Sequence, residues 1–213
     1  MSPLMASTVA LAVNRTWLEL KDLSRRGVRE SNASSVFDWV RERSHTFRGA
    51  VYGTLLRNDA FHFLRLGTFI ERADTTARVL DIRHVMATQS MAEHSTRSFF
   101  EWTALLHSLA AFEAYQNTYG HNLEPMNVAE LLVLSADVPR SLHSCLKEIS
   151  SLLEQVESGR AQRARRLASS LYANIRYGDR DYIAERGLHS YLVDFLGRIQ
   201  HIADQIQKDY TGW

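Results

Sequence analysis

The sequence predicts an all-α fold, a helical bundle of about seven to eight helices with no sheet. Apolar residues recur three or four positions apart along almost the whole chain of 213 residues. Alternating strand patterns are absent, and only Pro3, Pro125 and Pro139 are available to interrupt a helix. We therefore expect one helical domain over residues 1–213, with a long helix at about 59–87 in its centre.

The first three predicted helices are separated by recognisable stop and start signals. An apolar stripe that begins at Val9 predicts a first helix, and Gly27 is its expected stop. A second helix is expected at about 35–56. Asn58 or Asp59 then suits the N-cap of the third and longest helix.

The remainder of the chain is predicted to form five more helices. A fourth starts near Ser98 and ends before Gly120. Asn127, followed three residues later by Glu130, has the spacing of a capping box for a short fifth helix. Pro139 suits the first turn of a sixth. The last two helices carry apolar stripes formed by Ala164, Leu167, Leu171 and Ile175, and by Leu188, Leu192, Phe195, Ile199, Ile202 and Ile206.

Composition argues against several functional classes. The net charge is +1 and the pI about 8.0, so no global field steers the protein toward nucleic acid or an anionic membrane. Cys145 is the single cysteine, which excludes an internal disulfide and a cysteine metal cluster. The N-terminus lacks a basic n-region, and no stretch approaches the roughly 18 apolar residues of a membrane span. We therefore expect a cytoplasmic protein.

The segment "FIERADTTARVLD", residues 69–81, combines an apolar stripe with many charges. At about 100° per residue, a second stripe along the edge of the apolar one consists of Gly67, Glu71, Asp74, Arg78 and Asp81. The remaining face, expected to meet solvent or a partner, carries Arg65, Arg72, Thr76 and Arg83. Asp74 and Arg78 are spaced to form an ion pair along the helix. Periodicity favours an interhelical salt-bridge network, and a charged binding cleft remains the alternative.

Three segments together resemble the Alpha-E family, bacterial all-helical proteins named for a Glu-Arg motif. They are "GAVYGTLLRNDAFHFLRLGTFIERADTTARVLD", "FFEWTALLHSLAAFEAYQNTYG" and "ELLVLSADVPRSLHSCL", and they occur in family order. The resemblance places the motif on Glu71 and Arg72. It places the accompanying family residues on Gly53, Thr54, Arg57, Gly67, Asp74 and Arg78. Family members typically have an earlier helical half, so this chain is expected to be a shortened member or a C-terminal portion.

The resemblance implies a context of amide-bond formation. Alpha-E proteins are similar to accessory partners of ATP-grasp ligases, and transglutaminase-like peptidases often belong to the same systems. The implied role is that of a non-ATP-using helical component that binds the ligase or its peptide product. The binding residues implied are Glu71, Arg72, Asp74, Arg78 and Arg57. A missing half would leave apolar helix faces uncovered, so we also expect a homo-oligomer or a complex with another chain.

Other chemistry has weaker support in the sequence. "DIRH" at 81–84 has the spacing of one half of a di-iron motif, with Asp in place of Glu, and "ERGLH" at 185–189 has a different offset. We expect no bound metal and no cofactor. Cys145 falls on an apolar stripe, where a buried inert thiol is the usual state. "RAQRARR" at 160–166 lacks interleaved aromatic residues, so it favours a solvated helix face over a nucleic-acid site.

Two classes of function therefore remain. In the favoured one, the chain is an accessory binding component, with Glu71, Asp74 and Arg78 buried beside the core and Arg72 turned toward a partner. In the alternative, the chain is an enzyme acting on a peptide or amino acid, with Glu71 as its candidate catalytic acid or base. An enzyme requires these charges to converge on a pocket open to solvent, whereas a scaffold can pair them internally.

Overall fold

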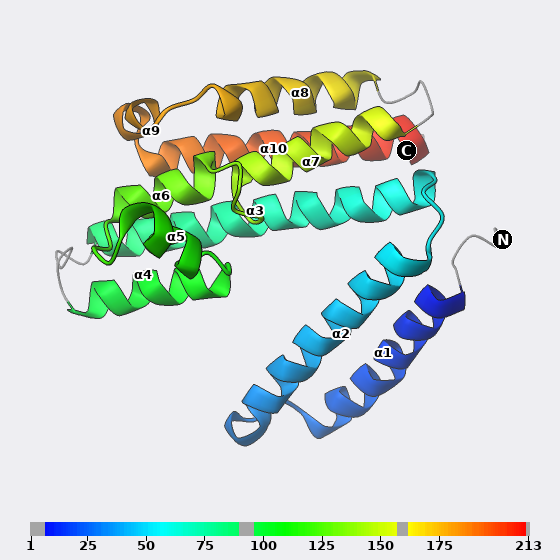
Figure 1. Cartoon of the computed structure of the whole chain (residues 1–213). Helices are drawn as coiled ribbons and strands as arrows, with labels where there is room; N and C mark the ends of the chain where they lie inside the picture. The colour runs from blue at the N-terminus through cyan, green and yellow to red at the C-terminus, as the bar shows by residue number, and fades with distance from the viewer. Residues whose placement is uncertain (1–6, 90–95, 157–161, 212–213) are drawn as a thin grey trace. The chain divides into compact units, whose positions relative to one another are not determined.

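The computed structural model describes residues 7–89, 96–156 and 162–211, and every regular element in these ranges is a helix (Figure 1). The all-α prediction is confirmed. The described ranges contain ten α-helices and one short 3-10 helix, so the expected seven or eight was too low. No helix in these ranges is both long and apolar enough to cross a membrane.

The chain divides into two compact units, residues 1–61 and 62–213. In the first, α1 (Ser7–Arg26) and α2 (Ala33–Thr54) form a helical hairpin joined through the 3-10 helix η1 (Glu30–Asn32). α1 stops where expected, because Gly27 adopts a φ of 72° that ends the helix. The fully buried core of this unit is small and consists of Val9, Val51 and Phe61.

The second unit holds α3 from His62 onward and all later helices, which Figure 1 labels. α3 runs over Asp59–Gln89, close to the predicted 59–87. The other helices are α4 (Thr96–Ser108), α5 (Phe112–Tyr119), α6 (Pro125–Leu134), α7 (Leu142–Gln155), α8 (Gln162–Arg176), α9 (Arg180–Arg186) and α10 (Leu188–Thr211).

α7 lies at the centre of the core of this second unit, in contact with α6 and α8. Its predicted apolar stripe is fully buried, Cys145 included. Ser141 forms the N-cap, because its side chain accepts a hydrogen bond from the Ser144 amide. Pro139 therefore precedes the helix instead of opening its first turn. α8 packs in turn against α10, and the buried apolar residues of α3 from Leu66 onward belong to the same core.

The predicted fourth helix is broken into α4 and α5. The Ala111 amide donates to the Leu106 carbonyl at 2.8 Å, and the Ala110 amide donates to the His107 carbonyl at 3.1 Å. This is the hydrogen-bond pattern of a Schellman motif, and it places Ala110 in the left-handed region at φ 53°. Glycine usually marks such a stop, and the alanine gives no such signal, so the break was not predicted.

The predicted capping box of α6 is also wrong. Its N-cap is Glu124, without a side-chain cap bond, and Pro125 takes the first turn. Asn127 and Glu130 instead both accept from Arg180 of α9, at 2.8 and 3.4 Å. The two residues that have the spacing of a capping box therefore connect α6 to α9, a helix far away in the sequence.

Candidate functional site

The charged residues of α3 divide between two edges of its apolar stripe, and the exposed edge is not the predicted one. Glu71 and Arg78 are exposed, and Asp74 is half-buried with 29% of its side chain accessible. The expectation that these three lie buried beside the core is therefore wrong for Glu71 and Arg78. We call Glu71, Asp74, Thr75 and Arg78 the exposed edge of α3.

Charges on this exposed edge are paired along the helix itself. Arg78 donates two hydrogen bonds to the Asp74 carboxylate, at 2.7 and 3.0 Å, and these bonds raise the pKa of Arg78. Glu71 accepts from the Thr75 hydroxyl at 3.1 Å. The predicted spacing of Asp74 and Arg78 thus forms an ion pair, but in solvent and within one helix. These residues do not form the interhelical network that periodicity favoured.

The opposite edge of α3 holds two interhelical ion pairs formed by arginines. Arg65 pairs with Glu148 of α7 and has 20% of its side chain exposed. Arg83 lies 2.6 Å from the Glu101 carboxylate of α4 and is 11% exposed. This edge was expected to meet solvent or a partner, and that expectation is wrong. Carboxylates from other helices pair with both guanidinium groups. This pairing offsets the free-energy cost of partly burying their charges.

Arg72 lies on this packed edge and not on a partner face. Arg72 is half-buried, and its guanidinium group stands 5.3 Å from the ring centre of Phe69, which is itself 7% exposed. One turn away, Thr76 is fully buried and donates to the Arg140 carbonyl at 2.9 Å. The charge of Arg72 also acts on the Cys145 thiol, whose pKa is nevertheless raised to about 12 because burial dominates. The thiol is therefore protonated at neutral pH and inert.

Two histidine motifs considered for metal binding contribute one residue each to a single contact. Asp81 of "DIRH" lies 2.7 Å from the Nδ1 atom of His189, the histidine of "ERGLH". This pair joins α3 to α10. Within the ranges that the structure describes, no group of three or more candidate ligand side chains comes together.

Arg57, the fifth predicted binding residue, belongs to the first unit. Its guanidinium group lies 4.1 Å from the ring centre of Phe61 and donates to the Tyr52 carbonyl at 3.1 Å. This arrangement fixes the turn between α2 and α3. Since Arg57 and the exposed edge of α3 fall in different compact units, they are described as two separate features.

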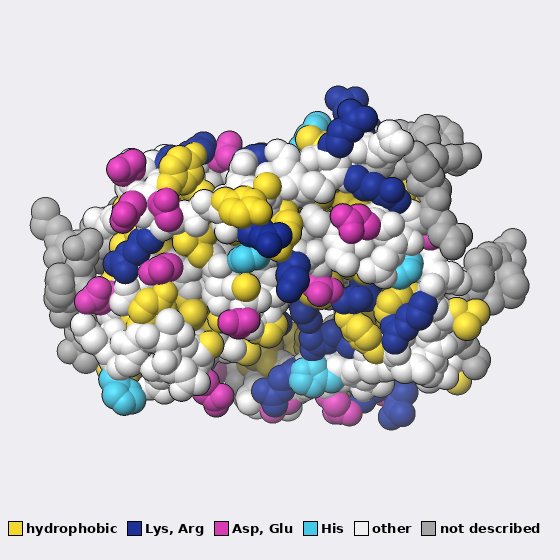
Figure 2. Space-filling model, turned by 45° about the horizontal axis from the view of Figure 1, so that its top comes forward, with side chains coloured by type: hydrophobic (Ala, Val, Ile, Leu, Met, Phe, Trp, Pro, Cys, Tyr) yellow, Lys and Arg dark blue, Asp and Glu magenta, His cyan; other side chains and the backbone are white. Residues whose placement is uncertain are grey.

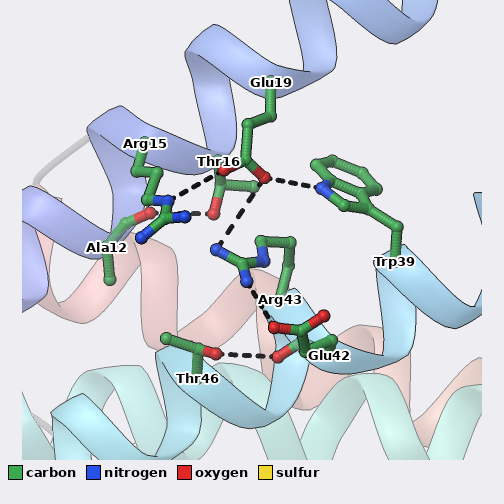
Figure 3. A network of polar contacts seen from close by, with 8 residues as sticks. All are labelled: Ala12, Arg15, Thr16, Glu19, Trp39, Glu42, Arg43 and Thr46. Carbon is green, nitrogen blue, oxygen red and sulfur yellow. Dashed lines mark hydrogen bonds and ion pairs between the residues drawn. The ribbon is translucent and has the colours of Figure 1, made fainter.

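A polar network links the two helices of the hairpin (Figure 3). The Glu19 carboxylate accepts from Arg15 at 2.8 Å and from the Trp39 indole at 2.6 Å, and these bonds lower the pKa of Glu19. Arg43 lies between Glu19 and Glu42, at 3.8 and 2.6 Å. The network ties α1 to α2 along one side of the hairpin.

Beside this network the hairpin has an apolar groove of about 440 Å³. The residues that line it are Val13, Thr16, Trp17, Leu20, Trp39, Val40, Arg43, Ser44 and Phe47. Trp17 is 53% exposed and Val40 50%, values unusual for side chains of this kind in a helix pair. Of these described lining residues, Arg43 alone is charged. The periodicity of α1 and α2 identified these apolar positions but gave no sign that they would be exposed.

The described part of the basic stretch, residues 162–166, does not form a continuous surface patch, and residues 160–161 lie outside the described ranges. Arg165 donates to the Leu153 and Val156 carbonyls at 2.6 and 2.5 Å, and so satisfies the end of α7. Arg163 and Arg166 are exposed. On the face shown in Figure 2, acidic and basic side chains occur together, with hydrophobic side chains between them.

Comparison with known proteins identifies one family. Residues 4–211 match Alpha-E, described as "a predicted alpha-helical domain with a conserved ER motif". No curated protein and no solved structure matches the chain. Glu-Arg occurs in this chain at 42–43, 71–72 and 185–186, and the pair on the long central helix is the one that the sequence resemblance assigned. Because the match spans nearly all 213 residues, the chain belongs to the Alpha-E family.

Proposed function

We propose that this protein is a non-ATP-using accessory component of an ATP-grasp amide-ligase system, and that it binds the ligase directly. The observation that carries the proposal is the apolar groove of the hairpin. A groove that exposes Trp17, Leu20 and Val40 offers the kind of surface that an amphipathic helix of another protein covers.

The groove has the composition of a docking site rather than a catalytic one. Aromatic side chains dominate the binding energy of protein interfaces, and Trp17 and Trp39 both line the groove. Its charged residue, Arg43, already has Glu19 and Glu42 as partners. An apolar helix face can therefore enter without leaving a charge unpaired.

The exposed edge of α3 supports binding over catalysis. Glu71 accepts from Thr75 one turn away, and Asp74 is held by Arg78. The hairpin groove includes neither Glu71 nor Arg72. An acid or base that acts on a substrate needs an enclosed position beside it. We therefore assign Glu71, Asp74 and Arg78 a role as a second, polar contact for the partner.

The experiment is a pull-down of an ATP-grasp amide ligase after its co-expression with the chain. Trp17→Ser should reduce the amount of ligase recovered, since truncating a central aromatic anchor typically costs about 2 kcal/mol, or roughly 30-fold in Kd. Leu18→Ser is the matched control, because Leu18 is 56% exposed on the same helix but lies outside the groove.

Equal recovery with the wild-type chain and with Trp17→Ser would contradict the assignment of the groove. An equal loss with Trp17→Ser and Leu18→Ser would also contradict it, because the effect would then come from a general loss of structure in α1. Size-exclusion chromatography with light scattering on the chain alone adds a third outcome. A stable homodimer that Trp17→Ser dissociates would assign the groove to a second copy instead.

A further inference from the structure

A cleft of about 490 Å³ lies between the end of α8, the short helix α9 and the first half of α10. Its volume is within the range of about 300–1,000 Å³ typical of small-molecule sites. None of the α3 residues discussed above lines it.

The floor of the cleft is apolar and its walls are aromatic. Leu171, Ile175 and Phe195 form the floor, and each is at most 3% exposed. The rings of Tyr182 and Tyr191 meet edge to face, with centres 6.4 Å apart. Burial raises the pKa of Tyr191 to about 12, so its hydroxyl stays protonated at neutral pH. This part of the cleft suits an apolar or aromatic group.

Two guanidinium groups line the cleft, and both lie at long distances from their shared carboxylate, Asp194. Asp194 lies 3.6 Å from Arg186 and 3.8 Å from Arg198, distances too long for hydrogen bonds. Arg186 donates to the Tyr182 hydroxyl at 3.0 Å. With the Asn174 amide oriented to accept, its oxygen lies 2.9 Å from both terminal nitrogens of Arg198. A guanidinium group has five N–H donors, so both arginines retain unused ones.

The unused donors of the two guanidinium groups suit an anion. The cleft has two carboxylates and two guanidinium groups, so its formal charges balance. Asp179 is held as the N-cap of α9, where it accepts from the Tyr182 amide at 2.7 Å, and Asp194 lies 3.6 Å from Arg186 and 3.8 Å from Arg198. A ligand carboxylate would accept from the unused N–H groups and match the fork of a guanidinium group.

Gly178 permits the tight turn that forms one side of this cleft. A Cβ atom at this position would lie 2.8 Å from the Asn174 carbonyl oxygen, closer than side chains tolerate. The glycine thus lets the chain turn directly from α8 into α9, and this turn sets Tyr182 and Arg186 opposite α10. The cleft is therefore built by a specific local sequence and not by chance spacing of surface helices.

We propose that this cleft binds a small ligand that carries a carboxylate beside an aromatic or apolar group. Arg186 and Arg198 bind the carboxylate, and the rings of Tyr182 and Tyr191 contact the apolar group. A free aromatic amino acid and the carboxyl terminus of a peptide share this chemistry. The proposal stands apart from ligase binding, which involves the hairpin and the exposed edge of α3.

Isothermal titration calorimetry on the full chain tests it with three probes. L-phenylalanine represents the free amino acid, N-acetyl-L-phenylalanine the end of a peptide, and L-phenylalaninamide lacks the carboxylate. We expect at least one of the two acids to bind about tenfold or more tightly than the amide, since a hydrogen bond to a charged group is lost in the amide. Tighter binding of the acetylated probe identifies a peptide end, and tighter binding of the free acid identifies an amino acid.

Substitutions of the two arginines test whether the ligand binds in the cleft. Arg186→Gln and Arg198→Gln should each weaken the better acid about tenfold or more. Arg163→Gln, an exposed arginine of α8 outside the cleft, should leave binding unchanged. Circular dichroism shows whether each variant folds. If only one of Arg186→Gln and Arg198→Gln folds, that variant is enough for the test. Failure of both acids to bind at several millimolar, equal binding of the amide, or equal weakening by Arg163→Gln would overturn the proposal.

Discussion

Replacing Glu71 and Arg72 separately by alanine should reveal which edge of α3 is packed. Arg72 is half-buried with its guanidinium group 5.3 Å from the ring centre of Phe69, whereas Glu71 is exposed and bonded to Thr75. A cation over an aromatic face contributes about 0.5–1 kcal/mol at exposed sites and up to about 2 when desolvated. Arg72→Ala also removes the packing of the aliphatic stem. We therefore expect a loss of about 1–2 kcal/mol.

For a chain of this size, about 1 kcal/mol shifts Tm by roughly 2–4 °C. Arg72→Ala should thus lower Tm by roughly 4 °C in differential scanning calorimetry. Glu71→Ala should change the free energy of unfolding by no more than about 0.5 kcal/mol, as is usual for surface substitutions. Arg72→Lys keeps the charge but loses the planar stacking, and should fall between Arg72→Ala and the wild type. A larger loss of stability in Glu71→Ala than in Arg72→Ala would refute the assignment of the two edges.

Two further predictions concern Ala110 and Cys145. Ala110→Gly should stabilise the protein by about 0.5–1 kcal/mol, because it relieves a left-handed strain of about 1–2 kcal/mol at a smaller cost in unfolded-state entropy; Ala114→Gly, within α5, is the control and should lower Tm. Urea unfolding of both variants measures this, and a destabilised Ala110→Gly would contradict the Schellman geometry. Burial raises the pKa of Cys145 from 9.0 to about 12, so its contribution to stability is complete below pH 9.0 and is lost as pH rises toward 12. Urea midpoints between pH 8 and 10.5 should therefore fall less steeply in Cys145→Ala, and an equal slope would contradict burial of the thiol.

The helices could be predicted largely because each has a continuous apolar stripe. The stripe of α7 and the extent of α3 follow directly from periodicity. The break at Ala110 could not be predicted, because no local sequence pattern indicates that an alanine will adopt a left-handed conformation. The prediction of the N-cap of α6 failed for another reason. Asn127 and Glu130 have a local spacing that suits a capping box, but both side chains bind Arg180 instead.

The candidate site shows what periodicity leaves undetermined. It predicts that α3 has an apolar stripe with charged residues on both edges, but not which edge another helix covers. That depends on Glu148 of α7 and Glu101 of α4, which supply the carboxylates for Arg65 and Arg83. The exposed groove of the hairpin was not predictable in detail either. Whether an apolar position such as Trp17 is buried depends on packing partners that lie outside the local sequence.

The measurement that tests the proposed function most directly is the rate of amide-bond formation by an ATP-grasp amide ligase, with and without this chain. Release of ADP and formation of peptide are followed together for the ligase alone, the chain alone and the mixture. We expect the mixture to exceed the ligase alone, the chain alone to release no ADP and form no peptide, and Trp17→Ser to lose the enhancement that Leu18→Ser retains. Identical rates for the ligase with and without the chain, or peptide turnover by the chain alone, would contradict the account.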